Sequence, residues 1–116
     1  MQNITLKNGR LSFSAIEAGE GPLVLCLHGF PDNYHSYDQQ IPALVNAGFR
    51  VVIPMLRGYE PQSQPSNGDY HLNKMVEDVQ GWINQLGAKK AHLVGHDWGA
   101  VIGYLTANTA PELLHS

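Results

Sequence analysis

Apolar residues recur along the chain with the two spacings that separate strands from helices. Residues 3–7 and 11–17 alternate apolar and polar side chains around Asn8-Gly9, a dipeptide that favours a tight hairpin turn. Three further runs are rich in apolar residues and have the length of strands buried on both faces. They lie at residues 23–27, 50–54 and 91–94. The chain is therefore predicted to begin with an antiparallel hairpin and to continue with buried strands.

Helical spacing occupies the segments between these strands. Apolar residues recur every three or four positions in residues 37–47 and 72–86, and a glycine directly follows each segment, as it does at many helix ends. Residues 98–108 predict another helix, which ends before Pro111. Residues 57–69 are rich in proline, glycine and small polar residues, and they are predicted to form a loop.

Alternation of strands and helices predicts an α/β fold, with a doubly wound and mostly parallel sheet that follows the antiparallel hairpin. The sequence has no internal repeat and no linker, so residues 1–116 are predicted to form one unit. Ligands of such sheets bind beyond the carboxyl ends of the strands. The loops at 28–32 and 95–99 both follow predicted strands. We therefore expect these two loops to share one site.

The sequence Gly95-His96-Asp97-Trp98-Gly99 joins the last predicted strand to the last predicted helix. A Gly-x-Asp-x-Gly turn in this context is typical of a nucleophile elbow, with aspartate where the better-known version carries serine. At Gly95 and Gly99 a larger side chain would collide with the incoming strand or the departing helix. Asp97 itself is expected to need strained dihedral angles. The helix N-terminus favours a charged carboxylate. Asp97 is therefore a candidate nucleophile; the alternative is that Asp97 only caps the helix.

Composition narrows the range of partners. The net charge of −3 gives no basic patch, so nucleic acid and anionic membranes are not expected partners. No apolar run approaches the length of a membrane span, and no signal peptide precedes residue 13, so a cytoplasmic location is expected.

Cys26 lies in an apolar run and is predicted to be a buried thiol. The histidines lack metal-ligand spacing, so neither a metal nor another cofactor is expected.

Four stretches resemble the α/β-hydrolase superfamily, and within it the branch of epoxide hydrolases and haloalkane dehalogenases. They follow one another in the order and at the rough spacing of that family. These stretches are His28-Gly29-Phe30-Pro31-Asp32, Arg57-Gly58-Tyr59, Leu86-Gly87 and Val94-Gly95-His96-Asp97-Trp98-Gly99-Ala100. The pairs Phe30-Pro31 and Asp97-Trp98 are more similar to epoxide hydrolases than to dehalogenases. The resemblance extends over nearly the whole chain and implies an α/β-hydrolase fold.

The resemblance also implies a mechanism. Asp97 would attack a carbon of a small apolar epoxide, or of a haloalkane in the alternative, and form an ester that water then hydrolyses; an epoxide would give a diol. The backbone N–H groups of Phe30 and Trp98 would form the oxyanion hole for the second step. A cis peptide bond before Pro31 is implied as well.

Other residues around these loops are expected to shape the site. They are His28, Gly29, Pro31, Gly95, His96 and Gly99. We expect His28 to have a structural hydrogen-bonding role and His96 to be a packed side chain of the elbow. The remaining histidines, which lie outside any motif, are expected at the surface; they are His35, His71, His92 and His115. Trp98 could also line the pocket, and Tyr59 and Trp82 could belong to the core.

In the family, the acid, the base histidine and the lid all follow the elbow helix. We therefore expect this chain to be the amino-terminal part of such a hydrolase, truncated after that helix and unable to turn over alone. The predicted strand at 91–94 would then have an exposed edge, where self-association is expected. A non-catalytic fragment, or a half that pairs with a partner, remains an alternative. Acyl hydrolysis is least favoured, because aspartate cannot form a durable acyl-enzyme.

Overall fold

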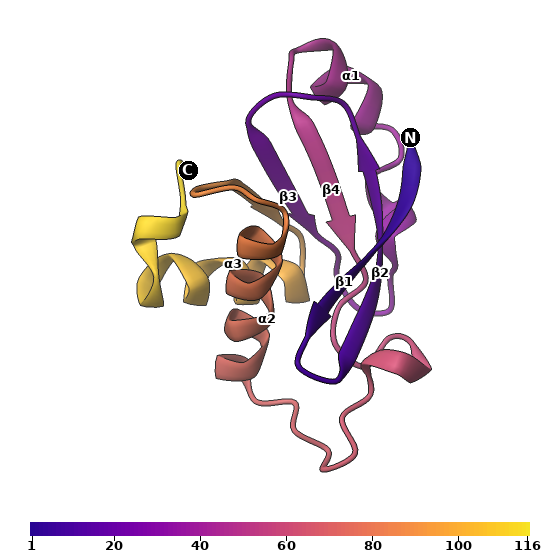
Figure 1. Ribbon diagram of the computed structural model, residues 1–116, viewed down its shortest axis with the longest axis vertical. Coiled ribbons are helices and arrows are strands. Elements are labelled where there is room, and N and C mark those ends of the chain that lie inside the picture. The colour runs from indigo at the N-terminus through magenta and orange to yellow at the C-terminus, as the bar shows by residue number, and fades with distance from the viewer.

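A mixed five-stranded sheet forms the centre of the molecule, which the computed structural model describes over residues 1–116 (Figure 1). The strands are β1 (Gln2–Asn8), β2 (Leu11–Ala18), β3 (Leu23–Leu27), β4 (Arg50–Pro54) and β5 (His92–Gly95). They lie in the order β1-β2-β4-β3-β5. β2 pairs antiparallel with β1 and β4, whereas β3 pairs parallel with β4 and β5. The predicted α/β fold with an antiparallel amino-terminal hairpin is confirmed.

Helices cover both faces of this sheet, as predicted. They are α1 (Ile41–Asn46), α2 (Leu72–Gln85) and α3 (Trp98–Thr109), with short 3-10 turns η1 (Tyr34–Tyr37), η2 (Pro61–Ser63) and η3 (Pro111–Leu113). Successive residues of β3 point to opposite faces, so Leu25 packs in the core beneath α2 and α3, while Cys26 packs in the core beneath α1. Trp82 lies in the first of these cores with its ring edge-on to Phe13, at a centroid distance of 5.0 Å. None of the helices is long and apolar enough to cross a membrane.

The helix predicted at residues 37–47 is shorter in the structure. Tyr37 belongs to η1, and α1 begins only at Ile41. Pro42 lies in the first turn of α1, where a missing N–H is tolerated. An earlier helix start would place this proline in the helix interior, where its ring collides with the carbonyl group four residues before it.

The prediction that the last strand is buried on both faces is wrong. Leu93 packs against the core beneath α2 and α3, but Val94, whose side chain lies on the other face, is 42% exposed as a residue. A hollow of about 370 Å³ separates Val94 from Ala43 and Leu44 of α1. The short α1 therefore leaves this part of the sheet uncovered.

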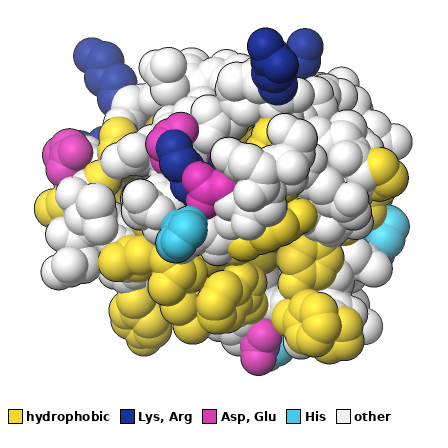
Figure 2. Space-filling view, turned by 90° about the horizontal axis from the view of Figure 1, so that it is seen from below, with side chains coloured by type: hydrophobic (Ala, Val, Ile, Leu, Met, Phe, Trp, Pro, Cys, Tyr) yellow, Lys and Arg dark blue, Asp and Glu magenta, His cyan; other side chains and the backbone are white.

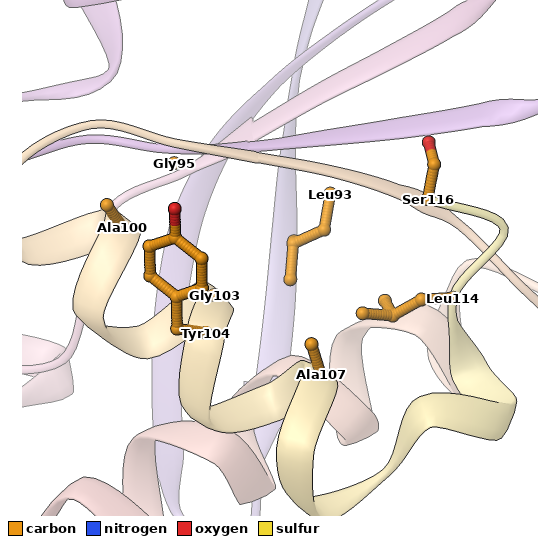
Figure 3. Close-up of a pocket in the computed structure, with 8 residues that line it drawn as sticks. All are labelled: Leu93, Gly95, Ala100, Gly103, Tyr104, Ala107, Leu114 and Ser116. Carbon is orange, nitrogen blue, oxygen red and sulfur yellow. The ribbon is translucent and has the colours of Figure 1, made fainter.

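The outer edge of β5 is less open than expected. Residues 113–116 run beside it: Ala91 N–H donates to the carbonyl oxygen of Leu113 over 2.8 Å, and Leu93 N–H donates to that of Ser116 over 2.9 Å. A groove of about 310 Å³ lies next to this pairing, and Figure 3 shows that Leu93, Tyr104 and Leu114 line it from three segments. The expectation of a bare edge is therefore wrong up to Leu93.

Candidate active site

The two loops singled out in the sequence meet at the carboxyl ends of the parallel strands. The arrowheads of β3 and β4 in Figure 1 point toward the end of the molecule where the loop before α2 lies. Residues 28–32 follow β3, and the elbow at residues 95–99 follows its neighbour β5. Phe30 N–H donates a hydrogen bond to Oδ2 of Asp97 over 3.1 Å. One backbone donor of the first loop thus contacts the candidate nucleophile of the second.

The backbone of Asp97 has the strain that a nucleophile elbow requires. Its φ of 57° and ψ of −118° make it the only non-glycine residue with positive φ. A Cβ on Gly95 would lie 2.5 Å from the carbonyl oxygen of Gly99, at the start of α3, and a Cβ on Gly99 would lie 2.3 Å from that of Leu27. The second collision is with β3, the neighbouring strand, and not with the strand that leads into the elbow. Only glycine fits at both positions.

Asp97 does not act as a conventional helix cap. It occupies the N-cap position of α3, but its side chain makes no capping hydrogen bond. The carboxylate instead turns toward the loop after β3, where Gly29 leaves the space for it. A Cβ on Gly29 would lie 2.6 Å from Cβ of Asp97. The alternative role of Asp97 as a simple cap is therefore not supported by the geometry.

The surroundings of Asp97 favour its charged form. Asp97 is exposed, and the backbone N–H of Phe30, followed by that of Trp98, lowers the pKa of its carboxyl group. Burial opposes these hydrogen bonds by raising the pKa, and the electrostatic influence of His96, which lowers it, is the smallest contribution. The carboxylate is consequently ionised at neutral pH and available as a nucleophile.

His28 is completely buried and makes two hydrogen bonds through its ring. Nε2 accepts from Leu56 N–H over 3.0 Å, and Nδ1 lies 2.9 Å from the carbonyl oxygen of Gly29. Because Nε2 is an acceptor, the neutral ring carries its proton on Nδ1 and donates it to Gly29. Burial lowers the pKa of the ring, and the ring of Tyr59 packs edge-on against it at 4.7 Å. This environment fits a structural role and leaves neither nitrogen free to act as a base.

The expectation that His96 is packed inside the elbow is wrong, because its side chain is exposed. Its backbone N–H donates to the carbonyl oxygen of Leu27 over 3.2 Å, so the turn fixes the main chain and directs the imidazole outward. Outside the motifs, His35, His71 and His115 are exposed as expected, whereas His92 is half-buried. No three histidine, cysteine or acidic side chains gather anywhere as metal ligands would.

A mostly apolar hollow of about 330 Å³ lies beside the elbow. Its lining consists of Phe30, Arg57, Gly58, Tyr59, Tyr70, Met75 and Trp98. Phe30 is 70% exposed, and its ring lies edge-on to that of Tyr59 at 6.4 Å. Figure 2 looks at this end of the molecule and shows hydrophobic side chains gathered over a broad area of it. The peptide bond between Phe30 and Pro31 is cis, as the resemblance implies.

An ion pair at the rim of this hollow was not predicted from the sequence, where Arg57 was quoted only as part of a motif and Asp78 was not singled out. Arg57 forms a buried bidentate ion pair with Asp78 of α2, with both N–O distances 2.8 Å, and also donates to the carbonyl oxygen of Asp69 over 3.1 Å. A Cβ on Gly58 would lie 2.5 Å from the ring of Tyr70. The only sequence signal is an acidic residue at a buried position of α2, which requires a cationic partner.

The chain matches a known family and proteins from several organisms. The model of the alpha/beta hydrolase fold family matches residues 22–116. The AB hydrolase superfamily protein YfhM of Bacillus subtilis (strain 168) is 39% identical over 105 residues, which cover 90% of this chain and 37% of that protein. Bifunctional epoxide hydrolase 2 of Sus scrofa is 40% identical over 111 residues, which cover 94% of this chain and 20% of that protein.

A solved structure agrees with these matches. The crystal structure of an epoxide hydrolase from Vigna radiata superimposes with a TM-score of 0.93 at 37% sequence identity. The superposition covers 99% of this chain and 38% of the other. The chain thus spans between a fifth and two-fifths of the length of these similar proteins.

Proposed function

The chain belongs to the alpha/beta hydrolase fold family, and we propose that it supplies the nucleophile and the oxyanion hole of an epoxide hydrolase reaction. Asp97 is the nucleophile, and the N–H groups of Phe30 and Trp98 form the hole. The similar proteins of Sus scrofa and Vigna radiata are named epoxide hydrolases, which supports this reaction. The observation that carries the proposal is the 3.1 Å hydrogen bond from Phe30 N–H to Oδ2 of the strained Asp97.

The first step needs no base. Oδ2 of Asp97 accepts from Phe30, which leaves Oδ1 to attack a ring carbon of the epoxide. The bond from Oδ1 to that carbon forms while the ring C–O bond breaks, and the ring oxygen keeps the electron pair and takes a proton from water. No base is required because the carboxylate is already ionised at neutral pH. The product is an ester of Asp97 with the ring-opened substrate.

The second step uses the oxyanion hole. Water attacks Cγ of the ester, and negative charge develops on Oδ2, which the N–H groups of Phe30 and Trp98 stabilise. The Cγ–Oδ1 bond then breaks, and the diol leaves with Oδ1 and one proton of the water. The carboxylate re-forms with the oxygen of that water, and the second proton neutralises the hydroxide left by the first step. This step requires a base, and the family resemblance implies a histidine that follows the elbow helix. We therefore expect the 116-residue chain to form the ester but not to turn over.

The hollow beside the elbow supports an apolar substrate. Phe30 and Trp98 belong both to the proposed oxyanion hole and to the wall of the hollow. Tyr59 and Tyr70 belong to the wall only. Aromatic side chains at this position favour an epoxide with a hydrophobic or aryl substituent. The substrate class that we propose is therefore a small apolar epoxide.

Intact-mass measurement after incubation with styrene oxide tests the proposal. We expect one addition of the mass of the substrate per chain, located at Asp97 by peptide mapping, and none in Asp97→Asn. Asp38→Asn removes an exposed carboxylate outside the site and should react like the wild type. An adduct on another residue, or an equal yield in Asp97→Asn, would overturn the proposed nucleophile. Steady-state diol production that depends on Asp97 would overturn the need for a base outside this chain.

The alternatives predict different products. A haloalkane dehalogenase would release halide from a haloalkane and leave an epoxide of matched size unopened. A non-catalytic fragment would form no adduct with either substrate at any concentration that leaves the chain folded.

A further inference from the structure

We propose that His28 is a positioning residue for the oxyanion hole, because its ring orients the peptide group that joins Gly29 to Phe30. The carbonyl oxygen of this peptide group accepts from Nδ1 of His28 over 2.9 Å, and its N–H donates to Oδ2 of Asp97 over 3.1 Å. One planar amide is thus held on both sides. The role in an oxyanion hole rests on the proposed function, whereas the orientation of the peptide group does not.

The ring of His28 is itself fixed. Nε2 accepts from Leu56 N–H over 3.0 Å, so the imidazole bridges the segment after β4 and the loop after β3. His28 has no exposed surface, and the ring of Tyr59 packs edge-on against it. The imidazole therefore fixes the Gly29–Phe30 amide relative to Leu56, which follows the carboxyl end of β4.

A hydrogen bond on the carbonyl side also strengthens the donor on the other side. Hydrogen-bonded chains polarise one another, so donation from Nδ1 to the carbonyl oxygen of Gly29 makes Phe30 N–H a stronger donor. In the resting protein this donor is the first cause of the lowered pKa of Asp97. In the ester it would face the developing oxyanion at the same place.

This arrangement requires a neutral His28. A protonated ring would present N–H groups at both nitrogens, and Nε2 would face Leu56 N–H as a second donor. The titratable groups at this end of β3 are Asp32 in the same loop, Tyr37 of η1, Tyr59 after β4 and Asp97 of the elbow. Asp32 favours the protonated ring, but burial opposes it more strongly.

Nuclear magnetic resonance of the 116-residue chain tests the proposal without any substrate. The readouts are the amide proton shift of Phe30 and the pKa of Asp97 from its carboxyl carbon. In His28→Leu, which loses both ring hydrogen bonds, we expect the Phe30 amide to move upfield and the pKa of Asp97 to rise toward its ordinary value of 3.8. His28→Asn keeps an N–H donor near the position of Nδ1 and should restore most of both values.

Tyr37→Phe is the matched control. It removes another buried hydrogen bond at the end of β3, from the Tyr37 hydroxyl to the carbonyl oxygen of Leu27, without touching the Gly29–Phe30 amide. Both readouts should stay at their wild-type values in this variant. Equal values in folded His28→Leu and wild type would overturn the proposal, as would an effect of Tyr37→Phe as large as that of His28→Leu.

A pH titration decides the matter if His28→Leu does not fold. In Asp97→Asn, where Asp97 no longer titrates, the Phe30 amide should shift in step with protonation of the His28 ring, below the ordinary histidine pKa of about 6.5. A Phe30 amide that stays still while the ring nitrogens of His28 titrate would overturn the proposal. Failure of Asp97 to react with an epoxide would contradict the proposed function but leave this result unaffected.

Discussion

Gly29 and Asp97 share a space that has no room for a second side chain. A Cβ on Gly29 would lie 2.6 Å from Cβ of Asp97 and 3.0 Å from its Oδ2. The two residues come from loops that follow neighbouring parallel strands, β3 and β5. Their contact places the carboxylate within reach of Phe30 N–H.

Gly29→Ala should therefore displace the carboxylate. We expect adduct formation with styrene oxide to slow by about 10²-fold, because a shift of about 1 Å misaligns the nucleophile. The matched control is Gly103→Ala, where a Cβ would meet Leu93 at an ordinary 3.7 Å. The measurement is the rate of mass addition by the folded variants. A wild-type rate in Gly29→Ala would contradict the steric role of this glycine.

The strained backbone of Asp97 should be visible in stability. Asp97→Gly and Asp97→Ala both lose the carboxylate, but only glycine tolerates a φ of 57° with a ψ of −118° without strain. The glycine variant should have a free energy of unfolding about 1 kcal/mol higher than the alanine variant. Urea unfolding measures the difference, and a less stable glycine variant would show that the elbow stores no strain.

The buried ion pair of Arg57 and Asp78 should respond asymmetrically to mutation. Asp78→Leu leaves the buried guanidinium without its partner and should lower the free energy of unfolding by about 3–5 kcal/mol. The double variant Arg57→Met with Asp78→Leu should recover a large part of this loss. Lys74→Met at the exposed pair with Glu77 is the control and should cost about 0.5 kcal/mol or less. Additive losses at Arg57 and Asp78 would argue against a coupled pair.

The pKa of Asp97 gives a prediction about pH. Its carboxyl group should titrate below the reference value of 3.8, because Phe30 N–H stabilises the charged form. A lowered pKa stabilises the fold above the unfolded-state pKa, and this contribution disappears as the pH falls through the folded-state value. Because Asp97 stays ionised well above this pKa, its ionisation should not change the rate of adduct formation between neutral pH and about pH 5. A carboxyl-carbon titration midpoint above 3.8 would refute the assignment of this hydrogen bond.

The self-association predicted for an exposed β5 edge is instead expected at the apolar groove next to it, because residues 113–116 cover that edge up to Leu93. Tyr104 is 80% exposed and lines this groove with Leu93 and Leu114. Sedimentation velocity should show a coefficient that rises with concentration, and Tyr104→Lys should weaken the rise. Asn108→Lys adds the same charge to an exposed position of α3 outside the groove and should have little effect. A monomer at all concentrations would count against association.

Local patterns in the sequence were sufficient for the elements and for the elbow. The period of apolar residues located the strands and the helix at 72–86, because strand and helix geometry repeat over a few neighbouring residues. The Gly-x-Asp-x-Gly motif located the sharp turn around Asp97. The steric demand at Gly95 is equally local to the turn, whereas that at Gly99 comes from Leu27 of β3 and depends on the assembled sheet. The resemblance to α/β-hydrolases rests on the same short motifs.

The tertiary structure alone decided which groups meet across the sheet. The pairing of β3 with both β4 and β5 brings His28 to Leu56 and Phe30 to Asp97, residues that are 28 and 67 positions apart. Two further features depend on the surrounding packing. They are the exposure of His96 and the pairing of residues 113–116 with the edge of β5. Such contacts follow from the packing of every element at once, and no periodic pattern in the chain encodes them.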